Sequence, residues 1–201
     1  MTLAYVRRFG TEQELEWVGG GVQRIVLDAN ATDGRLTVVR QSMRGGAASP
    51  VHVHQNEDET ILLLSGSGTF WAGRQRWELK SGDTVFLPRG LPHTYVLTSD
   101  EAELLTICNP GGFEEFLRAA GWDLSLPKPI DWAIDMQALA RAAEATGQKV
   151  LGPPLDLGDV MPAQYLHIEH AVQLSRRTRR RRWRPRCRRW LRHARADSET
   201  R

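Results

Sequence analysis

The feature that most constrains this chain is a set of nine residues at fixed offsets between positions 46 and 93. Two histidines stand one residue apart, a glutamate follows, and a third histidine comes later in the chain, with glycines and a proline between them. The nine residues are Gly46, His52, His54, Glu59, Gly66, Gly82, Pro88, Gly90 and His93. This pattern predicts short strands whose turns bring three imidazoles and one carboxylate together.

The spacing has a physical reason. Alternate residues of a strand point to the same face, so His52 and His54 offer two imidazoles to one interior. The polar run 55–58 suits a turn into the next strand, which brings the Glu59 carboxylate back beside them. Pro88 then bends the chain before His93, which arrives from a separate strand.

Three neutral imidazoles and a carboxylate form a site for Fe, Mn, Co, Ni, Cu or Zn rather than for calcium or magnesium. We therefore predict that His52, His54, Glu59 and His93 are metal ligands. Glu59 has two interpretations. It is either a ligand only, or also a catalytic general base that takes a proton from a bound enol.

With both motifs in place, separated by the 15 residues between Gly66 and Gly82, the chain resembles the cupin superfamily. The looser form of the second motif ends in Asn, where this chain has Leu97, but that Asn is not a metal ligand. Segments 31–39, 51–59, 108–116 and 150–155 resemble single-domain bacterial cupins related to quercetin dioxygenase. The resemblance covers about residues 17 to 155.

This resemblance implies a metal-dependent dioxygenase that cleaves a flavonol or a related planar enol with O₂ and releases carbon monoxide. It implies one divalent transition metal (Ni, Co, Mn or Fe) as cofactor, a small-molecule substrate and a homodimer. Two alternatives stay open. One is a cupin that binds a small molecule without turnover, with or without a metal. The other is a cupin isomerase, which turns over without oxygen.

The predicted fold is all-β with C-terminal helices, a single cupin jelly-roll barrel. Short segments bounded by Gly, Pro, Ser or Asp indicate strands at 22–29, 35–43, 51–54, 59–65, 69–73, 76–79, 84–88, 92–98 and 102–108. Apolar residues at helical spacing predict a helix after Gly112 and a second from Asp131, as N-cap, to Gly147. The apolar face of the second helix is expected to hold Met136, Leu139, Ala140 and Ala143. We expect a barrel with an N-terminal extension at 1–112, a helical segment packed on it at 113–174, and an Arg-rich disordered tail at 175–201.

Strand parity also suggests residues near the substrate. Tyr95 shares its parity with His93, and Ile61 and Leu63 share theirs with Glu59, so these three side chains form either barrel core or the wall of a pocket for a flat aromatic ligand. Alternation places Phe70 and Trp71 on opposite faces without showing which is inside. Cys108 is expected to be a small buried hydrophobe.

Charge divides the chain sharply. Residues 176–201 hold 13 Arg and a net charge of +11, which leaves −8 on residues 1–175. Three interpretations of the tail stay open: no selected role, an out-of-frame reading of GC-rich DNA, or non-specific binding of nucleic acid. His167 and His170 are expected at a solvent-facing helix end. With two cysteines and no apolar segment long enough for a membrane, we expect a cytoplasmic protein.

Overall fold

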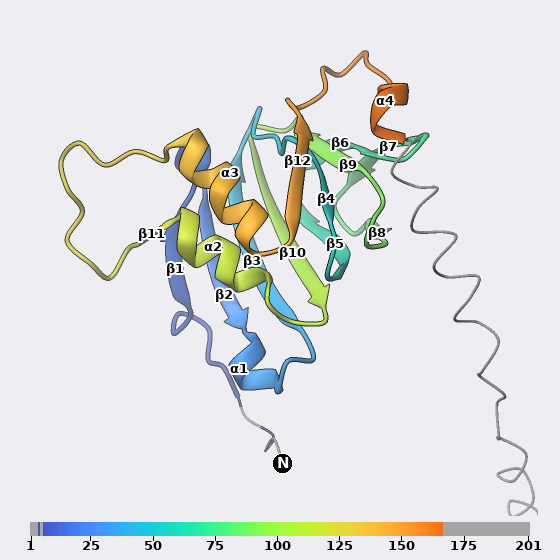
Figure 1. The fold of residues 1–201 in the computed structure, drawn as a ribbon. Coiled ribbons are helices and arrows are strands. Elements are labelled where there is room, and N and C mark those ends of the chain that lie inside the picture. The colour runs from blue at the N-terminus through green and yellow to red at the C-terminus, as the bar shows by residue number, and fades with distance from the viewer. Residues whose placement is uncertain (1–3, 5, 167–201) are drawn as a thin grey trace, which may run out of the picture. The chain divides into compact units, whose positions relative to one another are not determined.

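The computed structural model describes residue 4 and residues 6–166. His167, His170 and the Arg-rich tail lie outside this range. Within it, strands form two antiparallel sheets that pack face to face (Figure 1), which confirms the predicted all-β fold with C-terminal helices. The strands are β1 (Gln13–Glu16), β2 (Val22–Leu27), β3 (Thr37–Arg44), β4 (Val51–His54), β5 (Asp58–Ser65), β6 (Ser67–Ala72), β7 (Gln75–Lys80), β8 (Thr84–Leu87), β9 (His93–Leu97), β10 (Glu101–Asn109), β11 (Trp122–Asp123) and β12 (Gln148–Gly152).

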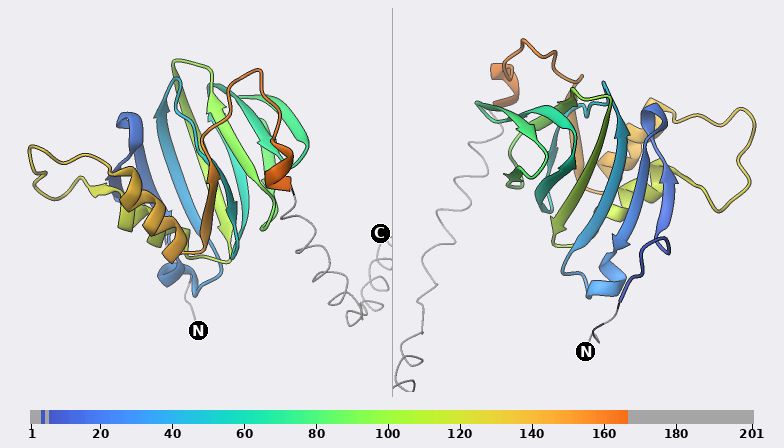
Figure 2. Two further views of the ribbon diagram at one scale, coloured as in Figure 1. Left: turned by 45° about the horizontal axis from the view of Figure 1, so that its top comes forward. Right: turned by 180° about the vertical axis from the view of Figure 1, so that it is seen from behind.

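One sheet has the order β11-β1-β2-β3-β10-β5-β8, and the other has the order β12-β4-β9-β6-β7. Figure 2 shows the two sheets from two further directions. The main hydrophobic core lies between them and takes apolar side chains from both. The sequence did not predict the short strands β1, β11 and β12. Of these, β11 and β12 each pair only with a strand that is distant in the sequence. The helices are α1 (Ala29–Thr32), α2 (Phe113–Ala120), α3 (Met136–Ala145) and α4 (Ala163–Leu166), with a 3-10 turn η1 (Val18–Gly20).

Both faces of β6 are buried. Phe70 belongs to the core between the sheets, whereas Trp71 packs on the outer face against Leu155, Met161 and Leu166. The indole N–H of Trp71 donates a hydrogen bond to the Asp159 carbonyl at 3.0 Å. The segment that leads into α4 therefore covers the outer face of the five-stranded sheet, a tertiary contact that strand alternation alone does not reveal.

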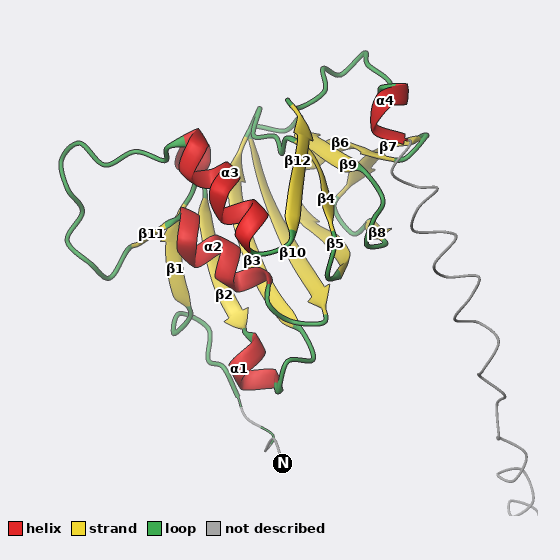
Figure 3. Cartoon of the chain, in the orientation of Figure 1, coloured by secondary structure: helices red, strands yellow, loops and turns green. Residues whose placement is uncertain are grey.

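The two longer helices, α2 and α3, come after β10 in the sequence and lie together in Figure 3. The start of α2 after Gly112 agrees with the prediction, but the predicted start of α3 was wrong. Asp135, rather than Asp131, is its N-cap, because the Asp135 carboxylate accepts hydrogen bonds from the N–H groups of Gln137 and Ala138. Leu139, Ala142 and Ala143 form its buried face, whereas Met136 and Ala140 are exposed, contrary to expectation.

Gly66 shows why the first motif ends in glycine. Its φ is +87°, in the left-handed region that side chains other than glycine rarely adopt. A Cβ atom there would lie 2.5 Å from the Glu101 carbonyl oxygen. Glycine therefore allows β5 to turn closely past β10 into β6.

Among the described residues, none of the helices has the length and apolar character that crossing a membrane requires. Cys108 is fully buried, as predicted for a small hydrophobe, and burial raises the pKa of its thiol.

Candidate metal centre

The structure brings the four predicted ligands together. His52 and His54 lie on β4, and His93 lies on the neighbouring strand β9 in direct register with His52, so that their rings are 4.2 Å apart. Glu59 comes from β5 of the opposite sheet. The four side chains therefore meet between the two sheets, where the third histidine and the carboxylate come from different strands, as the motif predicted.

The potential ligand atoms are close enough for a single ion. The Nε2 atoms of His52 and His54 are 3.1 Å apart, and Glu59 Oε2 lies 3.2 Å from His93 Nε2 and 3.8 Å from His54 Nε2. All four ligand atoms lie within 4.8 Å of one another. His54, Glu59 and His93 are buried, and His52 is half-buried.

Two of the three imidazoles are oriented by a hydrogen bond at their other nitrogen. His52 Nδ1 lies 2.8 Å from the Pro50 carbonyl and His93 Nδ1 lies 2.9 Å from the Leu91 carbonyl. Because carbonyl oxygens only accept hydrogen bonds, each Nδ1 carries the proton and donates it, which leaves a lone pair on Nε2. His54 differs, because its Nδ1 lies 2.9 Å from Glu57 Oε1, a close contact with a carboxylate that lacks hydrogen-bond geometry.

The second motif is fixed by the loop that precedes β9. Gly90, whose φ is +78°, donates its N–H to the His54 carbonyl at 2.8 Å. Arg89 makes paired contacts of 3.1 Å with the two carboxylate oxygens of Asp58, at the start of β5. These contacts tie the loop to both strands of the first motif and so position His93.

Two residues that support the site were missed by the sequence analysis. Glu57 is buried, and its Oε1 accepts a hydrogen bond from Gln148 Nε2 at 2.9 Å, while Gln148 Oε1 accepts one from the Thr146 hydroxyl at 2.7 Å. The sequence analysis places Glu57 in the polar turn at 55–58. Its spacing of two residues from Glu59 is nevertheless a signal that both side chains face the same side of a strand. Gln148 had no local signal, because it reaches His54 only through the pairing of β12 with β4.

The charges of the site are strongly coupled. Burial acts to raise the pKa of Glu59, but the nearby imidazoles of His54 and His93 outweigh it and lower that pKa to about 2. Burial and the neighbouring histidines His93 and His54 lower the pKa of His52. Burial acts to lower the pKa of His54 as well, yet the carboxylates of Glu59 and Glu57 raise it. Glu59 is thus ionised across the physiological range, which is the form that a metal ligand requires.

The donor set fits a divalent transition metal. Two Nε2 lone pairs 3.1 Å apart repel each other unless a positive charge lies between them. His93 Nε2 is buried and has no hydrogen-bond partner among the described residues, since its 3.2 Å approach to Glu59 lacks hydrogen-bond geometry. Nitrogen donors with a single carboxylate are typical of the later transition metals rather than of calcium.

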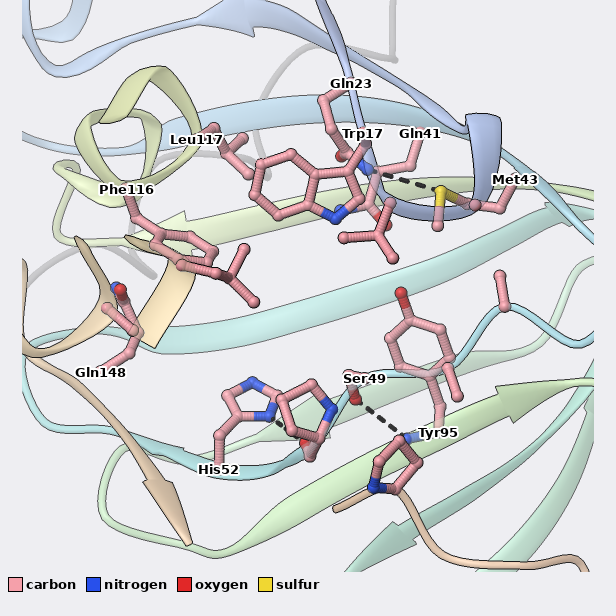
Figure 4. A pocket seen from close by; sticks show the side chains of 18 of the residues that line it. Trp17, Gln23, Gln41, Met43, Ser49, His52, Tyr95, Phe116, Leu117 and Gln148 are labelled. Carbon is pink, nitrogen blue, oxygen red and sulfur yellow. Dashed lines mark hydrogen bonds between the residues drawn. The ribbon is translucent and has the colours of Figure 1, made fainter. Parts of the chain in front are cut away.

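These side chains open onto a cavity of about 450 Å³, within the range of small-molecule sites. Figure 4 shows His52 and Tyr95 on one side of it, and Trp17 and Met43 on the other. Tyr95 and Ile61 line the cavity, together with residues of α2 and α3 that include Phe116. Leu63 does not line it. Although it has the parity of Glu59, it lies further along β5 and is fully enclosed in the core between the sheets.

Comparison with known proteins agrees with the fold and the motifs. The family model for the cupin domain matches residues 39–108, the segment that carries Glu59 and the three histidines of the candidate metal centre. This part of the chain therefore matches the cupin domain.

The chain also resembles two quercetin 2,3-dioxygenases. It is 33% identical over 103 residues to the quercetin 2,3-dioxygenase of Bacillus subtilis, which covers 51% of this chain and 31% of that protein. It is 32% identical over 75 residues to the quercetin 2,3-dioxygenase of Aspergillus japonicus, covering 35% of this chain and 21% of that protein. The chain therefore spans about a third or less of the length of these two relatives. Among solved structures it is similar to KdgF from Halomonas sp., with 17% identity, a TM-score of 0.49, and coverage of 54% of this chain and 94% of that one.

Proposed function

We propose that this protein is a metal-dependent dioxygenase that cleaves a flavonol, or a similar planar enol, with O₂. The observation that carries the proposal is the position of the three Nε2 atoms and the Glu59 carboxylate, which converge at the wall of a mostly apolar cavity. The similarity to two quercetin 2,3-dioxygenases supports the substrate class.

In this proposal His52, His54, His93 and Glu59 hold one divalent transition metal. When bound, the metal supplies Lewis acidity and a template for the enol oxygen and O₂. The hydrogen bonds that Pro50 and Leu91 accept keep two of the imidazoles in the tautomer that presents Nε2. The carboxylate of Glu57 lies 2.9 Å from Nδ1 of the third imidazole, His54.

Glu59 has a further role in the proposal, because it is ionised and lines the cavity where the substrate enol would lie. It takes the proton from the enol hydroxyl, which leaves an electron-rich enolate for reaction with O₂. Proton transfer by a positioned carboxylate contributes roughly 10²–10⁴-fold to a rate.

The aromatic walls suit a flat ring system. Trp17 packs edge-on against Phe116 with ring centres 5.5 Å apart, and Tyr95 stacks on Phe70 at 5.3 Å. These contacts hold Trp17, Phe116 and Tyr95 in place around the cavity. Planar substrates bury most of their surface in such a site, which keeps water away from the reacting enol.

The test is anaerobic reconstitution with Ni, Co, Mn or Fe, one at a time, followed by O₂-electrode assays with a panel of flavonols and other enols. The proposal predicts that O₂ uptake matches flavonol loss in a one-to-one ratio and that carbon monoxide is released. Ligand binding without O₂ uptake by any of the metal forms would indicate a binding protein instead. Turnover that continues without oxygen would indicate an isomerase.

A further inference from the structure

A pair of glutamines faces the cavity from the seven-stranded sheet. Gln23 on β2 and Gln41 on β3 are direct cross-strand partners, both are buried, and both line the cavity. Figure 4 shows them with Trp17 and Met43 on the wall opposite His52. The cavity therefore has a second polar region, which the metal centre does not use.

Gln23 has an unsatisfied hydrogen-bond acceptor. Its side chain is 1% exposed, and its Nε2 donates to the Met43 sulfur at 3.4 Å. Because a thioether sulfur can only accept, the amide nitrogen must face Met43, and the Oε1 atom points elsewhere. Oε1 is buried and has no hydrogen-bond partner among the described residues.

Such an atom is costly. A buried polar atom without a partner destabilises the folded state, and an apolar residue of the same shape at this position would avoid that penalty. The side chain of Gln41 makes no hydrogen bond to any other described residue either, so the neighbouring strand does not satisfy the acceptor.

We propose that Gln23 is a specificity-determining residue whose Oε1 accepts a hydrogen bond from a hydroxyl group on the end of the substrate remote from the metal centre. Gln41, beside it, offers a second amide to the same group. The substrate class in this proposal rests on the proposed function. Within that class, Gln23 selects planar substrates that are hydroxylated on an outer ring. Trp17 and Met43 supply apolar contacts around that hydroxyl.

Binding measurements on the full chain loaded with metal, in the absence of O₂, test the subsite without relying on turnover. The first pair of probes is a flavonol that carries a single hydroxyl on an outer ring and the same flavonol without that hydroxyl. The hydroxyl is placed on each outer ring in turn. The second pair is 2-naphthol and naphthalene, which lack the enol. Each pair is measured with the wild type, with Gln23→Met, which removes the acceptor at similar volume, and with Gln75→Met as a control on the exposed strand β7.

The wild type and Gln75→Met should bind the hydroxylated member of a pair roughly tenfold more tightly, and Gln23→Met should lose that preference while keeping its affinity for the other member. Gln23→Met should also melt at the same or a higher temperature, because it removes an unsatisfied buried atom. A preference for 2-naphthol that disappears in Gln23→Met supports the subsite even if no flavonol is consumed. Equal binding within both pairs by the wild type would overturn the proposal, as would a preference that survives in Gln23→Met or a variant that melts well below the wild type.

Discussion

Glu57 Oε1 lies 2.9 Å from His54 Nδ1 and also accepts a hydrogen bond from Gln148 on β12. The hydrogen bond from Gln148 joins the candidate metal centre to β12, a strand that follows α2 and α3 in the sequence. Because Gln148 is itself held by the Thr146 hydroxyl at the end of α3, the orientation of His54 depends on the C-terminal part of the described fold. The centre is therefore supported by residues well outside the two motifs.

Replacing Glu57 with Gln should weaken metal binding by roughly 10–100-fold, because the amide holds the His54 ring less firmly than the carboxylate. Competition with a chelator measures the affinity, and Glu78→Gln on the exposed face of β7 is the matched control. The folded structure should persist, as judged by circular dichroism. If Glu57→Gln binds metal as tightly as the control does, Glu57 has no part in orienting the ligand.

Replacing His52 with Ala should remove most of the bound metal, since one ligand is lost and the remaining three no longer surround the ion. Metal should raise the melting temperature of the wild type, because it binds only the folded state, and should raise that of His52→Ala far less. Elemental analysis and thermal melts with and without metal provide the measurement. Full occupancy in His52→Ala would show that the ligand assignment is wrong.

Glu59→Gln separates the two roles proposed for this carboxylate. The amide keeps a coordinating oxygen but cannot take a proton, so metal should be largely retained while flavonol turnover falls by roughly 10²-fold or more. Metal content and O₂ uptake are measured on the same samples. Equal losses of both would make Glu59 a ligand only, and unchanged turnover would remove it from the mechanism.

Asp28 links α1 to α2, because its carboxylate accepts hydrogen bonds from the Ala31 N–H at 2.9 Å and from Arg118 at 2.8 Å. Burial acts to raise the pKa of Asp28, but these partners lower it below its usual value of 3.8. Its contribution to stability is therefore present above that value and is lost as the pH falls through the folded-state pKa.

Asp28→Asn should accordingly lower the free energy of unfolding by about 1 kcal/mol near neutral pH, and the difference from the wild type should shrink in acid. Urea denaturation at several pH values measures it. Asp33→Asn, which changes an exposed ion pair with Arg35, should have little effect at any pH. A difference for Asp28→Asn that stays constant down to acid pH would contradict this account.

The sequence predicted those parts of the molecule that depend on local patterns. Strand alternation placed His52 and His54 on one face, and the motif spacing brought Glu59 and His93 to them. Helical spacing predicted α2. The start of α3 was misplaced because Asp131 and Asp135 are both residues suited to an N-cap, and it is Asp135 that accepts the capping hydrogen bonds.

What the sequence could not predict depends on pairing between distant segments. Gln148 reaches Glu57 only because β12 pairs with β4. The register of β2 with β3 makes Gln23 and Gln41 neighbours in the cavity wall. Leu63 has the parity of a cavity residue, but the depth of the cavity along β5 follows from the packing of both sheets.

X-ray absorption of the metal-loaded wild type tests the central claim most directly, because it reports the atoms bound to the ion. Cobalt-loaded protein should show three imidazole nitrogens and at least one oxygen at distances close to those of zinc centres, roughly 2.0–2.2 Å. Glu59→Gln should retain the three imidazoles, and His52→Ala should lose the spectrum of a specifically bound ion. A wild-type spectrum without the scattering pattern of several imidazoles would contradict the assignment of His52, His54 and His93 as ligands.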